Sequence, residues 1–263
     1  FDAQGPCLPV VTACATSTHA IGEAYRAIRH GYADAILAGG AEAAVEPLAI
    51  AGFTSCKALS EEKDPNLASL PFDLRRKGFV MGEGAGVVLL EEAEHALSRG
   101  ARIYGEVVGY GNTCDAYHIT APNPEGSGAA EAIRLALGEA GGLSGERLYI
   151  NAHGTGTMLN DKIETLSIRL ALGDERAKAA LVSSTKSATG HMLGAAGAAE
   201  FIAALMAVRT GTVPPTLHLD EPDPECDLDY VPHSARQWQP ELALSISLGF
   251  GGHNGALAVR SAL

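Results

Sequence analysis

The sequence predicts an α/β fold in which helices cover β-sheets. Apolar runs of strand length alternate along the chain with longer segments whose apolar residues recur every three to four positions. Aromatic residues make up only 5% of the 263 residues although 46% are hydrophobic, so small aliphatic side chains must fill the core. The 31 Gly and 13 Pro residues follow no period, which excludes collagen-like and low-complexity chains.

The first part of the chain alternates strands and helices. A short apolar run at 8–12 is predicted as a strand, and a helix at 17–30 follows because its apolar residues share one face. A buried strand at 33–37 is expected to end at a Gly pair. Further strands are predicted at 87–90 and 103–108.

The second part continues this alternation and contains no short tandem repeat. The predicted helices are 129–140, 162–172 and 194–209, and the predicted strands are 148–151, 180–183, 242–248 and 256–260. Long loops are expected at 61–74, 122–127 and 214–240. Strand–helix alternation favours a mainly parallel sheet covered by helices.

Charge and cysteine content narrow the class of protein. The net charge of −12 and the pI of about 5.1 argue against nonspecific binding to nucleic acid or to an anionic membrane. We expect no membrane span, since no apolar run approaches the roughly 18–20 residues that a span needs. Five Cys without close spacing predict free thiols and a reducing, cytoplasmic compartment. The sequence begins with Phe1 and has no signal peptide, as expected for the interior of a protein.

Cys14 is the first candidate for chemistry. It lies between the strand predicted at 8–12 and the following helix, where free N–H groups and the helix dipole favour a thiolate or hold an oxyanion. A buried structural cysteine is the alternative on position alone. The other cysteines have no such context and are interpreted as structural.

Two histidines and a lysine also follow predicted strands. His153 lies in a Gly- and Thr-rich loop, and His191 directly precedes a small-residue helix. Lys186 shares the loop of His191 and, if buried, needs a carboxylate partner. Glu164, on the helix that follows His153, is the candidate partner.

The turn at 249–252 places one aromatic residue, Phe250, among three glycines. It is either a β-turn with a core Phe or a backbone that approaches a ligand, with Phe250 as a gate. The Cys and His spacing lacks the pairs typical of zinc sites. The signatures of papain-like proteases and of phosphate-binding loops are also missing.

The segments that contain these residues resemble the Cys–His–His ketosynthases of the thiolase superfamily, and most closely those of bacterial fatty acid elongation. The resemblance covers essentially the whole chain, and the ordered set of motifs is highly specific. The matching segments are 12–16, 71–73, 78–84, 115–118, 151–155, 186–197 and 249–252.

The resemblance implies a thiolase-like fold, layered α-β-α-β-α with mixed, mainly parallel sheets, of which the N-terminal part is absent. It divides the chain into the remainder of an N-terminal half, 1–110, and a C-terminal half, 111–263. Because family nucleophiles lie well inside longer chains, roughly 150 family residues are expected to precede this sequence, removed or carried by a separate chain.

The resemblance also assigns the catalytic roles. Cys14 is expected to accept the acyl chain from a carrier thioester, and His153 and His191 to assist decarboxylation of a malonyl group and stabilise the enolate. Lys186, paired with Glu164, is expected to support the histidine site. Two neutral imidazoles can stabilise an enolate by donating N–H groups, and a thiol suits thioester exchange.

The substrate-binding residues are likewise implied by the family. The backbone N–H groups of Cys14 and Phe250 are expected to form the oxyanion hole, with Phe250 gating the nucleophile. Lys57 is the expected basic contact for an acidic carrier. The residues expected to contact the acyl chain or the pantetheine arm are Phe53, Thr120, Thr155, Thr157 and Gly251.

No metal or redox cofactor is expected, because the substrates are carried on the phosphopantetheine of acyl carrier protein. The family's cation site maps to a position where Ile246 replaces the usual Asn ligand. The other mapped positions are Asn151, Ala152, Glu200 and Ser245. The expected partners are acyl carrier protein and a second copy of the chain in a homodimer, with no nucleic acid and no membrane.

Three rival functions remain open at this point. A ketosynthase of a polyketide pathway differs in the residues that usually follow the nucleophile. A noncatalytic ketosynthase-like partner subunit would lack the nucleophile, whereas Cys14 is present. A degradative thiolase would need a second catalytic Cys in the segment 249–253, where none occurs.

Overall fold

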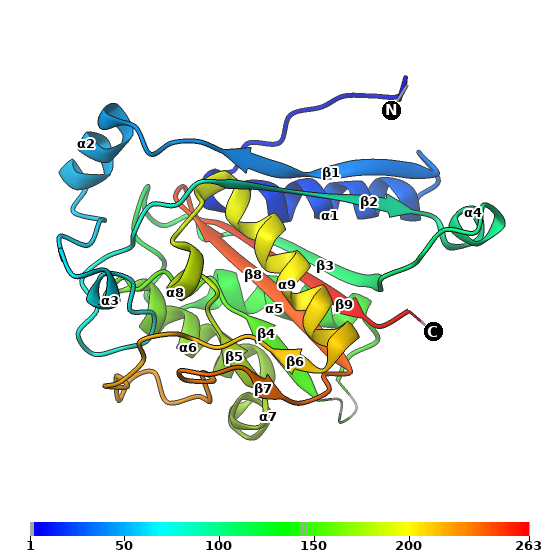
Figure 1. Ribbon diagram of the computed structural model, residues 1–263. Coiled ribbons are helices and arrows are strands. Elements are labelled where there is room, and N and C mark those ends of the chain that lie inside the picture. Colours follow the sequence, from blue (N-terminus) through cyan, green and yellow to red (C-terminus); the bar gives the residue numbers. More distant parts are fainter. Residues whose placement is uncertain (1–2, 144, 146, 263) are drawn as a thin grey trace.

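The computed structural model describes residues 3–143, 145 and 147–262, which form stacked layers of sheets and helices (Figure 1). A two-stranded antiparallel sheet lies on one side, and two helices separate it from a five-stranded sheet. Two more helices cover the far face of the larger sheet. The layered α/β arrangement predicted from the sequence is confirmed.

The elements of these layers match most of the predicted segments within a few residues. The small sheet consists of β1 (Ala35–Glu42) and β2 (Gly84–Glu91). The helices between the sheets are α1 (Thr16–Arg29) and α9 (Ala196–Thr210), and the outer helices are α5 (Ser127–Glu139) and α6 (Asn160–Leu172). The large sheet has the order β3 (Glu106–Cys114), β9 (His253–Arg260), β8 (Leu242–Gly249), β4 (Leu148–Asn151), β5 (Leu181–Ser183).

Shorter elements connect the layers. They are η1 (Ala13–Ala15), α2 (Pro47–Ser55), α3 (Pro65–Ala68), α4 (Ala93–Ser98), α7 (Asp174–Ala179), α8 (Lys186–Thr189), η2 (Leu193–Ala195), β6 (Thr212–Val213) and β7 (Arg236–Gln237). In each part of the chain an inner helix precedes a pair of antiparallel strands: α1 precedes β1 and β2, and α9 precedes β8 and β9.

The sheets are mixed, as expected, but the prediction of mainly parallel pairing is wrong for the described strands. Only β8–β4 and β4–β5 are parallel, whereas β1–β2, β3–β9 and β8–β9 are antiparallel. The short turn at 249–252 joins β8 directly to β9, and a turn of this length can connect only antiparallel strands.

Two local predictions also need correction. Residues 8–12 form no strand, because no described strand pairs with them, and Leu8 and Val11 are exposed. The strand predicted to end at the Gly pair continues through it. A Cβ on Gly39 would lie 2.0 Å from the carbonyl oxygen of Gly86, so glycine there permits the close pairing of β1 with β2.

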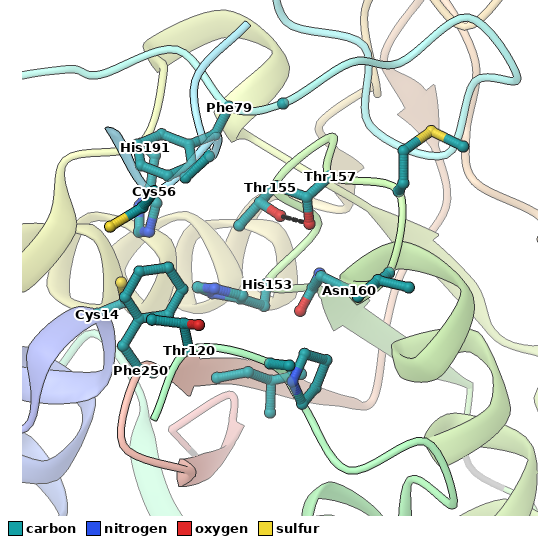
Figure 2. A pocket seen from close by; sticks show the side chains of 18 of the residues that line it. Cys14, Cys56, Phe79, Thr120, His153, Thr155, Thr157, Asn160, His191 and Phe250 are labelled. Carbon is teal, nitrogen blue, oxygen red and sulfur yellow. Dashed lines mark hydrogen bonds between the residues drawn. The ribbon is translucent and has the colours of Figure 1, made fainter. Parts of the chain in front are cut away.

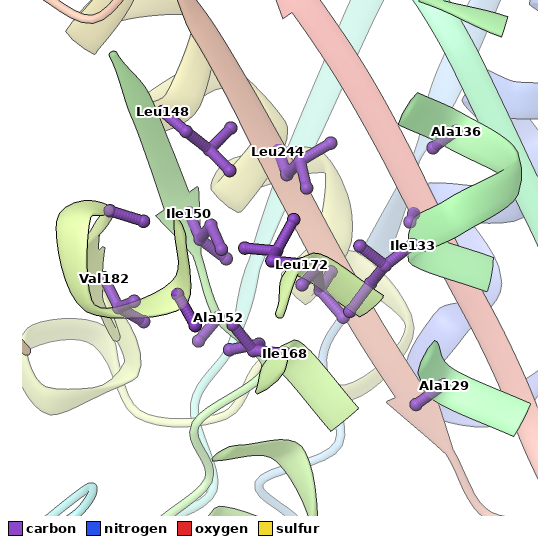
Figure 3. Close-up of a cluster of buried hydrophobic side chains, with 14 of the residues drawn as sticks. Ala129, Ile133, Ala136, Leu148, Ile150, Ala152, Ile168, Leu172, Val182 and Leu244 are labelled. Atoms are coloured by element: carbon purple, nitrogen blue, oxygen red, sulfur yellow. The ribbon is translucent and has the colours of Figure 1, made fainter. Parts of the chain in front are cut away.

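The core explains the low aromatic content. Ala198, Ala204 and Ala207 of α9 are at most 1% exposed, because this helix is packed between two sheets. A second cluster of buried apolar side chains lies between the large sheet and the outer helices. There, Ile150 and Leu244 of the sheet meet Ile133 and Ile168 of the helices (Figure 3). Full burial of each such aliphatic side chain contributes about 1.5–3 kcal/mol.

We expected no segment long and apolar enough to span a membrane. By the criteria of length and composition, this expectation is wrong. Among the described residues, the helical segment Leu193–Thr210 passes that test. It is 61% buried within the protein, as expected for a core helix between two sheets.

Candidate active site

A cavity of about 360 Å³ opens where β4 and β8 end. Since β8, β4 and β5 are parallel, the loops at their carboxyl ends meet at one edge of the sheet. These loops supply Phe250, His153 and Lys186, and η1 adds Cys14 from the other half of the chain. Four predicted catalytic residues line the cavity (Figure 2): Cys14, His153, His191 and Phe250.

Cys14 lies in η1, just before α1, and is 7% exposed. Its apolar neighbours include Phe79 and Leu193. Burial raises the pKa of the Cys14 thiol to about 11, although the Lys186 charge acts in the opposite direction. The position at a helix N-terminus therefore does not produce a resting thiolate, because desolvation outweighs the favourable charges. The resting nucleophile is a neutral thiol.

Backbone donors surround the sulfur atom. The N–H groups of Phe250 and of Cys14 itself lower the pKa of the thiol, which places both donors at the reacting atom. The two segments pack closely, since a Cβ on Gly249 would lie 2.8 Å from the Thr12 carbonyl oxygen. This geometry suits an oxyanion hole.

The two histidines face each other as neutral imidazoles. The ring centroids of His153 and His191 are 5.2 Å apart, with an interplanar angle of 86°. Burial, and next the positive charge of Lys186, hold both pKa values well below the usual range. His191 is fixed through its backbone, since its N–H donates to the Val80 carbonyl at 2.7 Å. Its Nδ1 is buried and has no hydrogen-bond partner among the described residues.

Lys186 fixes the tautomer of His153. The buried ammonium donates to the His153 carbonyl at 2.6 Å and lies 3.3 Å from His153 Nδ1. Because an ammonium can only donate, Nδ1 accepts and the ring proton lies on Nε2. His153 can therefore donate one N–H to a ligand.

The predicted pairing of Lys186 with Glu164 is wrong. Lys186 forms its ion pair with Glu200 of α9, whose carboxylate is equally buried. Burial raises the pKa of Glu200, and Lys186 opposes that shift. Glu200 could have been found in the sequence, because it is the only acidic residue in the Ala-rich helix α9.

Glu164 instead holds the loop of His153. Its two carboxylate oxygens accept the backbone N–H groups of His153 at 2.6 Å and Gly154 at 2.8 Å. Burial is the main reason that the pKa of Glu164 is raised to about 7. The residue is occupied by backbone donors, so it cannot also reach the lysine as the sequence led us to expect.

Aromatic side chains form the apolar side of the site. The Phe53 ring lies 5.4 Å from Phe79 and 6.3 Å from Phe250, between centroids. Gly251 is not among the residues that line the cavity, in contrast to its predicted substrate contact. Its N–H donates to the Ile119 carbonyl at 2.8 Å, so that turn is held away from the cavity.

The open side of the cavity is polar. Thr155 and Thr157 line it and hydrogen-bond to each other at 3.0 Å, and Thr120 lies opposite (Figure 2). Lys57 also lines the cavity, beside Cys56. All five cysteines are free, and Cys56 shares this cavity with Cys14, which its sequence context did not predict.

The side chains at the mapped cation position offer few ligands. Within the described part of the chain, Ser245 Oγ and one oxygen of Glu200 are buried without hydrogen-bond partners, and the Ile246 side chain has no ligand atom. Hard cations commonly take six or more oxygen ligands. Among the described residues, no group of three or more His, Cys, Asp or Glu could hold a metal ion. The side chains at this position therefore supply two free oxygen ligands, fewer than such a cation takes.

The layered fold, with a thiol and two imidazoles in one cavity, places the chain in the class of thiolase-like proteins. Two family models match the chain: "Beta-ketoacyl synthase, N-terminal domain" over residues 1–96 and "Beta-ketoacyl synthase, C-terminal domain" over residues 104–220. The chain belongs to the beta-ketoacyl synthase family.

Curated relatives agree with this assignment. The chain is 56% identical to 3-oxoacyl-[acyl-carrier-protein] synthase 2 of Synechocystis sp. over 99% of its length, and 50% identical to that of Coxiella burnetii over 98%. It spans 62% and 63% of the length of these relatives.

Solved structures show the same fold. A type II polyketide synthase ketosynthase, solved with its acyl-carrier protein, matches with a TM-score of 0.95 and 40% identity over 99% of this chain and 64% of that chain. A beta-ketoacyl synthase from Burkholderia phymatum matches with a TM-score of 0.93 and 39% identity, over all of this chain and 63% of that chain.

Proposed function

We propose that the protein is a 3-oxoacyl-[acyl-carrier-protein] synthase of type 2, which elongates fatty acids by decarboxylative condensation. The observation that carries the proposal is one cavity holding a buried thiol, two neutral imidazoles and converging backbone N–H groups. Identity of 50–56% to relatives with this name supports it. We expect no metal or redox cofactor.

The first step transfers the acyl chain. The Cys14 sulfur attacks the acyl thioester, and the thiol proton passes to the departing pantetheine sulfur. The carbon–sulfur bond to pantetheine breaks as the bond to Cys14 forms. The N–H groups of Cys14 and Phe250 stabilise the tetrahedral oxyanion. Because the thiol is neutral at rest, its deprotonation accompanies the attack.

The second step generates the carbon nucleophile. A malonyl thioester loses carbon dioxide, and its electron pair becomes an enolate on the thioester oxygen. His153 donates its Nε2 proton in a hydrogen bond to that oxygen, and the neutral His191 lies beside it. A cationic imidazole is not needed, and burial together with the nearby ammonium of Lys186 disfavours one by lowering the pKa of His153.

The third step forms the carbon–carbon bond. The enolate carbon attacks the acyl-Cys14 carbonyl, whose oxygen is again held by the two backbone donors. The Cys14 thiolate leaves and takes up a proton, so one carbon dioxide and one β-ketoacyl thioester are formed per cycle. The low solvent access of the site protects the enolate from premature protonation.

The carrier and the oligomeric state extend the proposal. We expect acyl carrier protein to present the substrates, because Lys57 and the threonine pair line the open side of the cavity. A related ketosynthase was solved with its acyl-carrier protein. We also propose a cytoplasmic homodimer; the free cysteines and the exposed apolar residues Leu8 and Val11 support it.

A polyketide ketosynthase is the alternative with a specific observation behind it. A polyketide ketosynthase and the ishigamide ketosynthase/chain length factor match this fold at 40% and 42% identity. The higher identity to fatty acid relatives favours elongation of saturated chains. Product analysis with saturated acyl-carrier and malonyl-carrier separates them: repeated condensation without reduction would favour the polyketide reading.

Intact-mass measurement of the acyl-enzyme tests the proposed function. Hexanoyl-carrier should add one hexanoyl group to the protein, and the C14A variant should take up none. The C56A variant is the matched control, because Cys56 lines the same cavity. Equal acylation of C14A and the unmodified protein would overturn the proposal.

A further inference from the structure

Arg76 is a buried cation that the reaction above does not use. Its side chain is fully buried, and Nη1 donates to the Asp223 carboxylate at 2.8 Å. Asp161, also fully buried, lies 3.6 Å from Nε. A buried arginine with two carboxylates needs a structural or functional reason, since desolvation is costly.

Nη1 also donates to the Asp73 carbonyl at 2.8 Å, and the two other nitrogens of Arg76 bind the backbone of one loop. Nε donates to the Thr157 carbonyl at 3.1 Å, and Nη2 donates to the Met158 carbonyl at 3.2 Å. The same segment is held from its other side, where Gly78 N–H donates to the Gly156 carbonyl at 3.1 Å. Gly156 N–H in turn donates to Asp161 at 3.2 Å. Three successive peptide groups are therefore fixed by Arg76 and its neighbours.

This loop is the polar wall of the cavity. Thr155 and Thr157 both line it, and their hydroxyls hydrogen-bond to each other. A hydroxyl that recognises a ligand must be held within a fraction of an ångström. The arginine lies behind the wall and does not line the cavity, so its contacts act through the backbone of the loop.

We propose that Arg76 is a positioning residue for the pantetheine arm: it holds the 156–158 backbone so that Thr155 and Thr157 present their hydroxyls to the arm. This inference rests on the proposed function. The planar fork of a guanidinium reaches two adjacent carbonyls and a carboxylate together, which the single ammonium of a lysine cannot do.

The neighbouring Arg75 separates this role from general bracing of the loop. Arg75 binds Asp73 at 2.8 Å and Asp220 at 3.0 Å, so it braces its own loop against the segment 220–223, which Arg76 also contacts through Asp223. None of its hydrogen bonds within the described residues reaches 155–158. A purely structural role should make substitutions of the two arginines look alike.

The test compares two thioesters in the R76K variant. Hexanoyl-pantetheine carries the amide arm, whereas S-ethyl thiohexanoate has no amide group and meets only the thiol and the oxyanion donors. Acylation of Cys14 is followed by intact mass as the thioester concentration is varied. R76K should raise the half-saturating concentration of hexanoyl-pantetheine roughly tenfold, the loss of about one good hydrogen bond. Its rate with S-ethyl thiohexanoate should stay within about twofold.

The controls make each result decisive. R75K should change neither substrate by more than about twofold. In a T155A/T157V background, R76K should have no further effect on hexanoyl-pantetheine, because the groups it positions are gone. Equal losses with both thioesters, or an unchanged half-saturating concentration, would overturn the inference. If R76K does not fold, D223N is measured in the same way, since it removes the ionic anchor and leaves the arginine.

The same experiment separates the inference from the proposed function. If hexanoyl-pantetheine fails to acylate Cys14 in the unmodified protein, the proposed function is contradicted. If it acylates Cys14 and R76K behaves like R75K, only the role of Arg76 is lost.

Discussion

The two sides of the cavity are equally buried but chemically opposite. Around Cys14 the neighbours are apolar, with Phe79 and Leu193 in contact and Phe53 beside them. Around His153 they are ionic, because Lys186, Glu200 and Glu164 lie within the same few ångströms. Burial is the main cause of the perturbed pKa values on both sides: it raises the pKa of the Cys14 thiol and lowers that of His153, which the Lys186 charge lowers further.

The difference indicates a division of labour between two half-reactions. The apolar side keeps a neutral thiol with backbone donors, which suits acyl transfer. The ionic side keeps imidazoles neutral and fixes a proton on Nε2 of His153, which suits stabilisation of an enolate. Changes on one side should therefore leave the other half-reaction in place.

Breaking the ion pair of the ionic side should have the largest effect. K186M leaves Glu200 buried without its cation, so the free energy of unfolding should fall by about 3–5 kcal/mol in urea titrations. The double variant K186M/E200L removes both charges and should regain most of that loss. A single-variant loss below about 1 kcal/mol would contradict the account.

The next effect concerns pH and Glu164. Because its pKa is raised to about 7 from 4.5, the folded protein binds this proton more tightly than the unfolded chain does. Its contribution to stability is therefore complete below pH 4.5 and is lost as the pH rises through about 7.

The E164Q variant removes that titration. Between pH 4.5 and 7.5, the stability of the unmodified protein should fall relative to that of E164Q by about 3 kcal/mol at most. Urea unfolding at several pH values measures the difference. A difference that does not change with pH would show that Glu164 does not titrate as described.

On the apolar side, the raised thiol pKa should slow alkylation. With a pKa of about 11 rather than 9.0, Cys14 has about 100-fold less thiolate at pH 8. The rate of modification by iodoacetamide, read at the Cys14 peptide, should keep rising to pH 10. The urea-unfolded protein is the reference, and a plateau near pH 9 in the folded protein would contradict the assignment.

Replacing the exposed charge of Lys57 should have the smallest effect, and this effect should be on binding of the carrier. K57E places a negative charge on the open side of the cavity, and the half-saturating concentration of an acidic acyl-carrier should rise roughly two- to fivefold at low salt. The effect should shrink at about 0.5 M salt, because salt screens the attraction between exposed charges. K178E, on α7 and away from the cavity, is the matched control. Similar changes in both variants would remove Lys57 from the docking surface.

Much of the fold could be predicted because local patterns agree with it. The periodic helices α1, α5, α6 and α9 and the buried strands β4 and β8 lie within a few residues of their predicted ranges. Strand direction could not be predicted in this way, because pairing depends on partners distant in sequence. The run 8–12 has strand composition but no described partner.

Site residues were predictable where a motif placed them at strand ends. Cys14, His153 and His191 meet in one cavity as expected. The ion-pair partner of Lys186 could not be predicted from the sequence. Glu164 and Glu200 both come from helices near the site, and only packing decides between them. Arg76 was missed because it lies among three adjacent basic residues that read as a solvated loop.

Carbon dioxide release from malonyl-carrier tests the division of labour most directly. C14A should still decarboxylate malonyl-carrier to within about tenfold of the unmodified protein while forming no acyl-enzyme. H153A should lose decarboxylation by about 10²–10³-fold, the effect of removing one oxyanion donor, while Cys14 still accepts a hexanoyl group. If C14A abolishes carbon dioxide release as completely as H153A does, the two sides do not act separately and the account is wrong.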